Sequence, residues 1–379
     1  MNYLFLTIIG IYSTIIFVAV VRWLKITHRR LPGFVEQSGF FSIIIPVRNE
    51  AQTITRLLDA IAEQQVQKTS FEVIVVDDHS TDGTLELVQS QSRPYKLTVL
   101  SLEKINKYDG VTISGKKHAI SEGIKHAAGE IIITTDADCY MGKDWLGSIY
   151  NYFAVNNAKM VVGPVAFDGA KGLFEELQSI EFAVLIGVGA VALESGSPNM
   201  CNGANLAFRK KVFYEVEGYS GNFHIPSGDD EFLLQKIYSR FPRDVYFNSS
   251  KASVVYTEPV SSIWSFIDQR RRWSSKWKLH KSWGVKAVAL GVFCFHLFLI
   301  ISLVAAISGD LHLGVFAGGM VVKAIAELFF LKKLLDHFDK PLAAVNFILL
   351  QAIYSIYVLV FGVLSNFGSF EWKGRSYKQ

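Results

Sequence analysis

The chain has 379 residues, of which 50% are hydrophobic and 19% are charged, and its formal net charge is +4. With a mean hydropathy of +0.27, this composition is too apolar for an ordinary soluble enzyme and too charged for a protein embedded entirely in a membrane. The basic excess clusters beside the apolar segments, so the charge does not indicate a nucleic-acid partner. The three cysteines are dispersed without metal-ligand spacing, which argues against a zinc site or a disulfide framework.

Four apolar runs predict membrane-spanning helices. Residues 3–21 carry no charge, no basic n-region and no clear cleavage site, so we interpret them as a signal anchor rather than a cleaved signal peptide. The other runs cover about 287–308, 312–331 and 342–364. Basic stretches follow the first run and precede the second, so the positive-inside rule predicts a cytoplasmic domain between them and an outside N-terminus. Three spans after the domain would place the C-terminal tail outside, although its basic residues favour the inside. Either one of the three runs is re-entrant or interfacial, or the tail breaks the positive-inside rule.

The predicted organisation has four parts, namely an N-terminal anchor at 1–24, a cytosolic domain at 38–282, membrane helices at 285–366 and a tail at 367–379. The cytosolic part is long enough to bury a core of its own. The sequence therefore predicts an integral membrane protein of a bacterial inner membrane whose globular domain is cytoplasmic.

The globular part begins with strands that alternate with helices. Continuous apolar, β-branched runs predict strands buried on both faces at 40–47, 71–78, 96–102 and 131–139. Helices are expected after the first two strands, and Asn49 is expected to cap the first helix. This alternation predicts an α/β fold with a right-handed, mostly parallel sheet.

Polar side chains follow the strand ends, where such sheets bind ligands; they are Arg48, Asp77, Asp78, Asp136 and Asp138. Strand geometry would hold Asp136 and Asp138 roughly 6–7 Å apart, and two repelling carboxylates suggest a positive charge between them. The pair suits a hard divalent cation that keeps positions open for phosphates, with a solvated strand end as the alternative. Asp77 and Asp78 either close a turn or accept hydrogen bonds from a nucleotide.

Three segments downstream have two interpretations each. Asp229, Asp230 and Glu231 open an amphipathic helix, where acids complement the helix dipole or one of them acts as a general base. Gly203 marks either a turn or a close backbone approach to a ligand. Residues 182–193 are uncharged but too short to span a membrane, which predicts a core or an interfacial helix.

The order of the motifs resembles that of the family 2 glycosyltransferases, membrane-bound enzymes with a GT-A fold that are related to cellulose and hyaluronan synthases. The resemblance covers roughly residues 40–280 and rests on the succession IIIPVRNE, VIVVDDHSTDGT, GKKHAI, TTDADC, NGANLAFRK, SGDDEFLLQK and QRRRW. The last motif lies in a basic and aromatic stretch, 268–281, which a lipid interface favours on its own. The resemblance assigns a function to it.

The resemblance implies a role for each matching residue. The nucleotide-sugar donor would be bound by Pro46, Arg48, Glu50, Asp77, Asp78, Lys116, Asp136, Gln269, Arg272 and Trp273. Within that set, Arg272 would meet the diphosphate and Trp273 would lie near the acceptor. Asp138, together with Asp136, would hold Mg²⁺ or Mn²⁺ on the diphosphate.

The resemblance also implies the catalytic base. Asp230 matches the second acid of the family's acidic pair and would deprotonate the acceptor hydroxyl. Because this chain has Asp-Asp where the family usually has Glu-Asp, Asp229 is the other candidate.

The implied function is that of an inverting hexosyltransferase that moves a sugar from a UDP- or GDP-sugar to a lipid or growing glycan acceptor. A single base without a second nucleophilic carboxylate agrees with inversion. A processive polysaccharide synthase is the alternative; QxxRW favours it, whereas four short spans would form a channel poorly. A non-catalytic membrane scaffold is less favoured because every expected site acid is present. Lys323 and Glu327, four residues apart, would pair within the membrane or lie near its edge.

Overall fold

The computed structural model describes residues 1–29, 39–104, 115–223, 225, 227–274, 283–364, 367, 369–373 and 375–378. The chain forms two compact units. The sheet unit comprises Arg29–Gly169 and Ala192–Glu258, and the helical unit comprises Met1–His28, Ala170–Val191 and Pro259–Gln379. Residues 275–281, the second half of the basic stretch expected at 268–281, lie outside the described residues.

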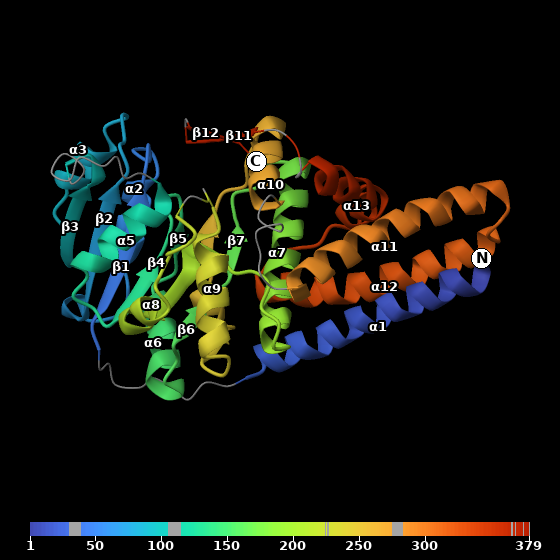
Figure 1. Ribbon diagram of the computed structural model, residues 1–379, viewed down its shortest axis with the longest axis horizontal. Helices are drawn as coiled ribbons and strands as arrows, with labels where there is room; N and C mark the ends of the chain where they lie inside the picture. Colours follow the sequence, from blue (N-terminus) through green and yellow to red (C-terminus); the bar gives the residue numbers. More distant parts are fainter. Residues whose placement is uncertain are drawn as a thin grey trace. The chain divides into compact units, whose positions relative to one another are not determined.

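The sheet unit is built on a seven-stranded sheet in the order β3-β2-β1-β4-β8-β6-β9 (Figure 1). Its strands are β1 Phe41–Val47, β2 Phe71–Asp77, β3 Lys96–Ser101, β4 Ile131–Thr134, β6 Met160–Val162, β8 Leu206–Arg209 and β9 Val245–Phe247. The pairs β3–β2, β2–β1, β1–β4 and β6–β9 are parallel, whereas β8 is antiparallel to both of its neighbours. The predicted α/β fold with a mostly parallel sheet is confirmed.

Burial explains why these runs form strands. All of β2 is buried, and Ile43, Ile44 and Ile45 of β1 are fully shielded from solvent, as expected for central strands covered on both faces. Helices and short 3-10 turns complete the unit: α2 Ile54–Ala62, α3 Thr84–Gln89, α5 Lys116–His126, α6 Trp145–Asn156, α8 Lys210–Glu215, α9 Asp229–Arg240, η1 Lys68–Ser70, η2 Gly203–Asn205 and η3 Lys251–Ser253. A second sheet, in the order β5-β10-β7, consists of β5 Tyr140–Met141, β10 Val255–Thr257 and β7 Val165–Phe167.

The prediction that Asn49 caps the first helix is wrong. Helix α2 begins at Ile54, with Thr53 before it. Asn49 instead adopts a positive φ of 53°, and its side-chain oxygen accepts a hydrogen bond from the Thr81 amide at 2.8 Å. Asparagine tolerates this conformation, so the residue joins the loops after β1 and β2 rather than starting a helix.

The fourth strand is also shorter than predicted. β4 ends at Thr134, and the Cys139 amide donates to the Asp136 carbonyl at 3.1 Å, which closes a turn. A turn rather than a strand therefore presents Asp136 and Asp138, and the spacing inferred from strand geometry does not apply to them.

The helical unit contains most of α7 Leu173–Glu194, together with α1 Asn2–Thr27, α10 Ile263–Ser274, α11 Trp283–Ser308, α12 Leu313–His337, α13 Ala344–Leu364, β11 Ser369–Trp372 and β12 Arg375–Lys378. Helices α1, α11, α12 and α13 contain the four apolar runs, and each is long and apolar enough to cross a membrane. The same holds for α7, so the expectation that this segment is too short is wrong. Its helix begins nine residues before the uncharged run, and Figure 1 shows that it runs in a different direction from α11.

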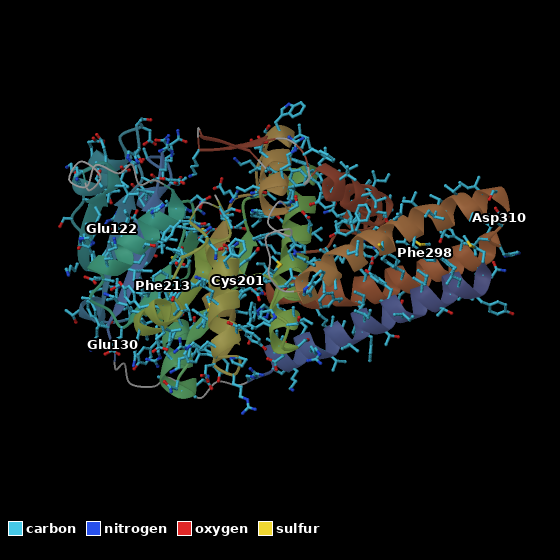
Figure 2. The ribbon with its side chains drawn as sticks, in the orientation of Figure 1. Glu122, Glu130, Cys201, Phe213, Phe298 and Asp310 are labelled. Carbon is cyan, nitrogen blue, oxygen red and sulfur yellow. The ribbon has the colours of Figure 1, made fainter. Side chains whose placement is uncertain are left out.

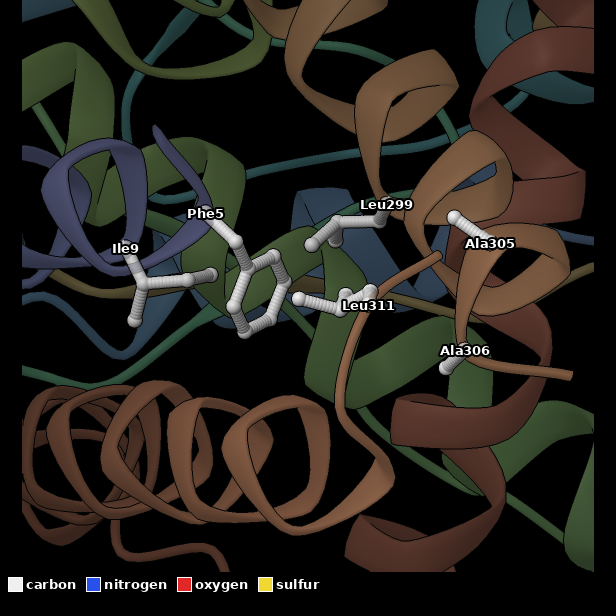
Figure 3. Packing of buried hydrophobic residues seen from close by; sticks show 6 residues of the cluster. All are labelled: Phe5, Ile9, Leu299, Ala305, Ala306 and Leu311. Carbon is white, nitrogen blue, oxygen red and sulfur yellow. The ribbon is translucent and has the colours of Figure 1, made fainter. Parts of the chain in front are cut away.

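Close packing joins the apolar helices. A Cβ atom added to Gly319 of α12 would lie 2.4 Å from the Phe5 ring of α1, so glycine permits the two helices to approach. Figure 3 shows Phe5 beside Leu299 of α11 and Leu311 of the following loop. Figure 2 shows Asp310 at the tip of the α11–α12 hairpin. Between Lys286 and Lys323 no other Asp, Glu, Lys or Arg occurs, so the hairpin is uncharged along both of its helices over this stretch.

The pair formed by Lys323 and Glu327 is present, with 2.8 Å between Nζ and the carboxylate. Gln351 of α13 accepts from Lys323 at 3.0 Å and donates to Glu327 at 2.6 Å. The Tyr12 hydroxyl of α1 also donates to Glu327. This pair therefore links α1, α12 and α13 through satisfied hydrogen bonds.

We predict that a buried carboxylate, Glu72 of β2, stabilises the sheet unit in a pH-dependent way. Its side chain is fully shielded and accepts from Ser42 at 2.8 Å, the Ala128 amide at 2.6 Å and Lys96 at 2.7 Å. Burial alone raises the pKa of Glu72, but the hydrogen bonds from Lys96, Ala128 and Ser42 outweigh it and hold the pKa below its usual value.

Glu72→Gln should therefore cost about 1–3 kcal/mol at pH 7. A carboxylate with a depressed folded-state pKa stabilises above its unfolded pKa, roughly 4.3, and loses that contribution as pH falls through the folded-state value. Thermal unfolding in detergent at pH 7, 5 and 3 should show the gap between wild type and variant shrinking at pH 3. Glu63→Gln, at an exposed position, should show no such gap at any pH. A constant gap for Glu72→Gln would contradict the assignment.

Candidate active site

Acidic side chains from distant parts of the sequence converge on Lys116, the first residue of α5. Its Nζ atom lies 2.6 Å from Asp136 and 3.4 Å from Asp229, and its side chain is only 17% exposed. Burial would lower the pKa of Lys116, but the two carboxylates outweigh burial and raise it. Lys116 is therefore a permanent cation, and it supplies a positive charge next to the paired acids.

The acidic pair lies at the start of α9. Asp229 is buried, and the Asp230 carboxylate accepts from the Gly203 amide at 3.0 Å and from the Glu231 amide at 2.7 Å. A Cβ atom added to Gly203 would lie 2.9 Å from Asp229 and 3.4 Å from Lys116. Gly203 begins the 3-10 turn η2, which agrees with the first of its two interpretations, and its backbone lies close to the site's own side chains.

The turn after β4 presents two carboxylates with different surroundings. Asp136 contacts Lys116, and Asp138 is open to solvent, with one oxygen accepting from the Thr257 hydroxyl at 3.4 Å. Among the described residues no three His, Cys, Asp or Glu side chains gather into a closed metal cage. Asp136 and Asp138 would supply carboxylate oxygens to a hard cation, and oxygens of a bound phosphate group would complete its ligands.

The loops after β1 and β2 are joined to the start of α5. The Arg48 guanidinium donates to the carbonyls of Asp78 and His79 at 2.7 and 3.2 Å. The Asp78 carboxylate accepts from the Gly115 amide at 2.9 Å, immediately before Lys116. The predicted convergence of strand-end side chains therefore holds for β1, β2 and β4, which are neighbours in the sheet.

Three further residues expected to bind the donor have structural roles in the same region; they are Asp77, Pro46 and Glu50. Asp77 is buried and accepts from the Ser80 amide at 3.3 Å, as in a turn; burial raises the pKa of Asp77. Pro46 lies in β1 opposite Val76 of β2. Glu50 is buried, with its carboxylate accepting from the Thr53 hydroxyl at 2.7 Å.

Lys117 is a residue of this region that the sequence did not single out. Its buried Nζ atom donates to the carbonyls of Asn222, Ile225 and Ser227, each at 2.8 Å. These three carbonyls shortly precede α9, so Lys117 holds the segment that leads into the acidic pair. The sequence contains no signal that distinguishes Lys117 from its neighbour.

Gln269, Arg272 and Trp273 lie on α10 of the helical unit. The buried member of this motif is Arg270, which sequence reasoning missed. It forms an ion pair with Glu181 of α7. Helical spacing could have indicated it, because positions 266, 270 and 273 share one face of a helix.

Family models identify the class of protein. The model described as glycosyl transferase family 2 matches residues 42–217, and the model described as glycosyl transferase family group 2 matches residues 131–364. The second match covers more than half of the chain. The protein therefore belongs to the family 2 glycosyltransferases, which confirms the resemblance and the enzyme class.

Two individual proteins resemble the chain over most of its length. A curated relative, 4,4'-diaponeurosporenoate glycosyltransferase of Staphylococcus aureus strain USA300, is 26% identical over 349 residues, which are 89% of this chain and 88% of the relative. The solved structure of mannosyltransferase PcManGT from Pyrobaculum calidifontis, in complex with GDP-Man and Mn²⁺, has a TM-score of 0.56 and 18% identity. That alignment covers 96% of this chain and 98% of the other, and it supports the GT-A fold.

We predict that Gly203→Ala lowers glycosyltransferase activity at least about tenfold, because the added methyl group displaces Asp229 and Lys116. The displaced atoms are the ends of side chains, so the melting temperature should change by less than about 2 °C. Gly142→Ala is the matched control, since nothing lies within 4 Å of its added Cβ atom. Equal activities of the two variants would show that the close approach at Gly203 has no role in the site.

Proposed function

We propose that this protein is a membrane-bound, inverting glycosyltransferase that transfers a sugar from a nucleotide-sugar donor to a lipid acceptor. The observation that carries the proposal is the cluster in which Lys116, at the start of α5, joins Asp136, just after the carboxyl end of β4, to Asp229 at the start of α9. Such a cluster combines groups that hold a diphosphate with acids that activate an acceptor.

The donor is a UDP- or GDP-sugar. The loops after β1 and β2, which contain Arg48 and Asp78, would contact the base and ribose. Lys116 would neutralise charge on the leaving diphosphate. Asp136 and Asp138 would hold Mg²⁺ or Mn²⁺, and the cation would supply further positive charge there. GDP-Man and Mn²⁺ in the structural neighbour support this donor chemistry.

The acceptor is activated at the start of α9. Asp230 is oriented by the amides of Gly203 and Glu231, and it would remove the proton of an acceptor hydroxyl as the oxygen attacks the anomeric carbon. Asp229, which faces Lys116, would keep that cation in place. Attack opposite to the leaving diphosphate inverts the anomeric configuration.

A lipid acceptor agrees with the apolar helices. Within the described residues, five helices are long and apolar enough to cross a membrane, which supports an integral membrane protein that meets its acceptor in the bilayer. The basic stretches beside them support a cytoplasmic sheet unit. The curated relative is named for one discrete acceptor rather than a polymer, which favours single transfer over processive synthesis.

We predict that the purified protein releases nucleoside diphosphate from one donor in a panel of UDP- and GDP-sugars, with Mn²⁺ or Mg²⁺ and membrane lipid extract as acceptor. Asp138→Asn should lower release about 100-fold or more, because the cation loses a ligand. Asp230→Asn should lower it about 10²–10⁴-fold through loss of the base. Asp59→Asn, on an exposed part of α2, is the matched control and should retain activity. No release from any donor would contradict the proposal.

A carboxylate acceptor is the second candidate, because the name of the curated relative specifies a carboxylate. A carboxylate is ionised at neutral pH and needs no base before it attacks. In that case Asp230→Asn would cost less than about tenfold, whereas Asp138→Asn would still abolish release. The ratio of the two effects therefore distinguishes a hydroxyl acceptor from a carboxylate acceptor.

A further inference from the structure

We infer that Arg270 is a positioning residue that fixes Gln269 and Trp273 of the motif helix α10 by tying them to two other helices of the helical unit. The inference rests on the proposed function insofar as Trp273 serves the acceptor. Arg270 itself stands between the recognised positions of the motif, and no role follows for it from the sequence.

On one side, Arg270 is held by partners from α7 and α13. The residue is only 4% exposed, and its guanidinium forms an ion pair with Glu181 of α7, whose side chain is 8% exposed. Its Nε atom donates to the Tyr357 hydroxyl of α13 at 2.9 Å, and that hydroxyl donates to Glu181 at 2.5 Å. The three side chains form a closed triangle in which each polar group has a partner.

On the other side, Arg270 contacts the motif. Its Nη1 atom donates to the Gln269 side-chain oxygen at 2.7 Å. Its guanidinium carbon lies 4.4 Å from the centre of the Trp273 ring, a cation–π distance. The Trp273 ring also stacks on Phe182 of α7, with 5.6 Å between ring centres.

The chemistry explains why arginine is required at this position. A guanidinium is planar and has five donors, so it can bind Glu181, Tyr357 and Gln269 together while one flat face contacts Trp273. A lysine at 270 would keep the charge but lacks the planar fork and the flat face with which the guanidinium meets its three partners and Trp273. The arrangement is rigid because the charge is buried. If the guanidinium moved away from any one partner, a buried polar group would be left without a hydrogen bond. Gln269 and Trp273 are thereby fixed before any substrate binds.

The alternative is that the ion pair only stabilises the fold. A matched pair in the same unit tests this, because Lys323 is 5% exposed, pairs with Glu327, and is bridged by Gln351 and a tyrosine. This second pair has similar chemistry, and none of its hydrogen bonds involves α10. Disrupting it should therefore destabilise the protein without changing the motif.

The first measurement is independent of activity. The near-ultraviolet circular dichroism of wild type minus that of Trp273→Phe gives the signal of the Trp273 ring in detergent. For the Arg270→Met variant the same signal is its spectrum minus that of the double variant Arg270→Met, Trp273→Phe. We expect this signal to be at most about half of the wild-type signal, because the ring loses a fixed contact. Lys323→Met, treated in the same way, should retain it. An unchanged signal in Arg270→Met would overturn the inference.

The second measurement separates acceptor from donor. With the donor that wild type uses, and with lipid extract titrated as acceptor, Arg270→Met and Arg270→Lys should raise the half-saturating lipid concentration about tenfold or more. Affinity for the nucleoside diphosphate with Mn²⁺, measured by calorimetry, should fall by a smaller factor, because Gln269 is only one of several residues expected to bind the donor. Glu181→Gln should shift acceptor saturation in the same direction by a smaller factor, since the neutral amide still accepts a hydrogen bond.

The outcomes are distinguishable. Two results would show that Arg270 only stabilises the fold. One is a half-saturating lipid concentration in Arg270→Lys equal to that of wild type. The other is the same rise of that concentration in Lys323→Met as in Arg270→Met. If wild type transfers no sugar, the proposed function fails, while the circular dichroism experiment still decides whether Arg270 positions Trp273.

Discussion

Mutual repulsion among carboxylates is the constraint on which the site depends. Asp136 and Asp229 come from separate parts of the chain and would repel each other if they met alone. Lys116 lies within 3.4 Å of both and makes their proximity favourable. Because Lys116 starts α5 directly after Gly115, whose amide binds Asp78, the same helix start also orders the loop after β2. One cation thus organises acids that the sequence separates by about a hundred residues.

In the helical unit, too, each buried charge lies beside an opposite charge, here among apolar side chains. Arg270–Glu181 and Lys323–Glu327 are both buried ion pairs, and each is completed by neutral side chains that satisfy the remaining donors and acceptors. Buried pairs contribute little net stability compared with well-packed apolar residues, but they penalise any arrangement that separates them. Their value here is specificity, since each pair selects one way of packing three helices. Of the two pairs, the one with Arg270 also contacts motif residues, because its guanidinium touches Gln269 and Trp273.

Several features of the fold could be predicted from local sequence. Strands β1 and β2 follow directly from continuous β-branched runs, because only a strand covered on both faces accommodates them. The apolar helices follow from length and hydropathy in the same way. Asn49 could not be predicted, because its conformation depends on a hydrogen bond to Thr81 in another loop. The early end of β4 was missed because the β-prone run leads without a break into residues that a local bond from Cys139 to Asp136 folds into a turn. The extent of α7 was missed because its acids, which include Glu181, are paired only in the folded unit.

The sequence by itself determined the family, the strand order along the chain and the set of acids that could act in a site, since these depend on residue type and local periodicity. The tertiary structure decided which charges meet. In the sequence Lys116 is one of two lysines in GKKHAI and Arg270 is one of three arginines in QRRRW, and only folding places carboxylates beside them. Electrostatic interactions depend on distance through space and on burial, and a linear sequence specifies neither.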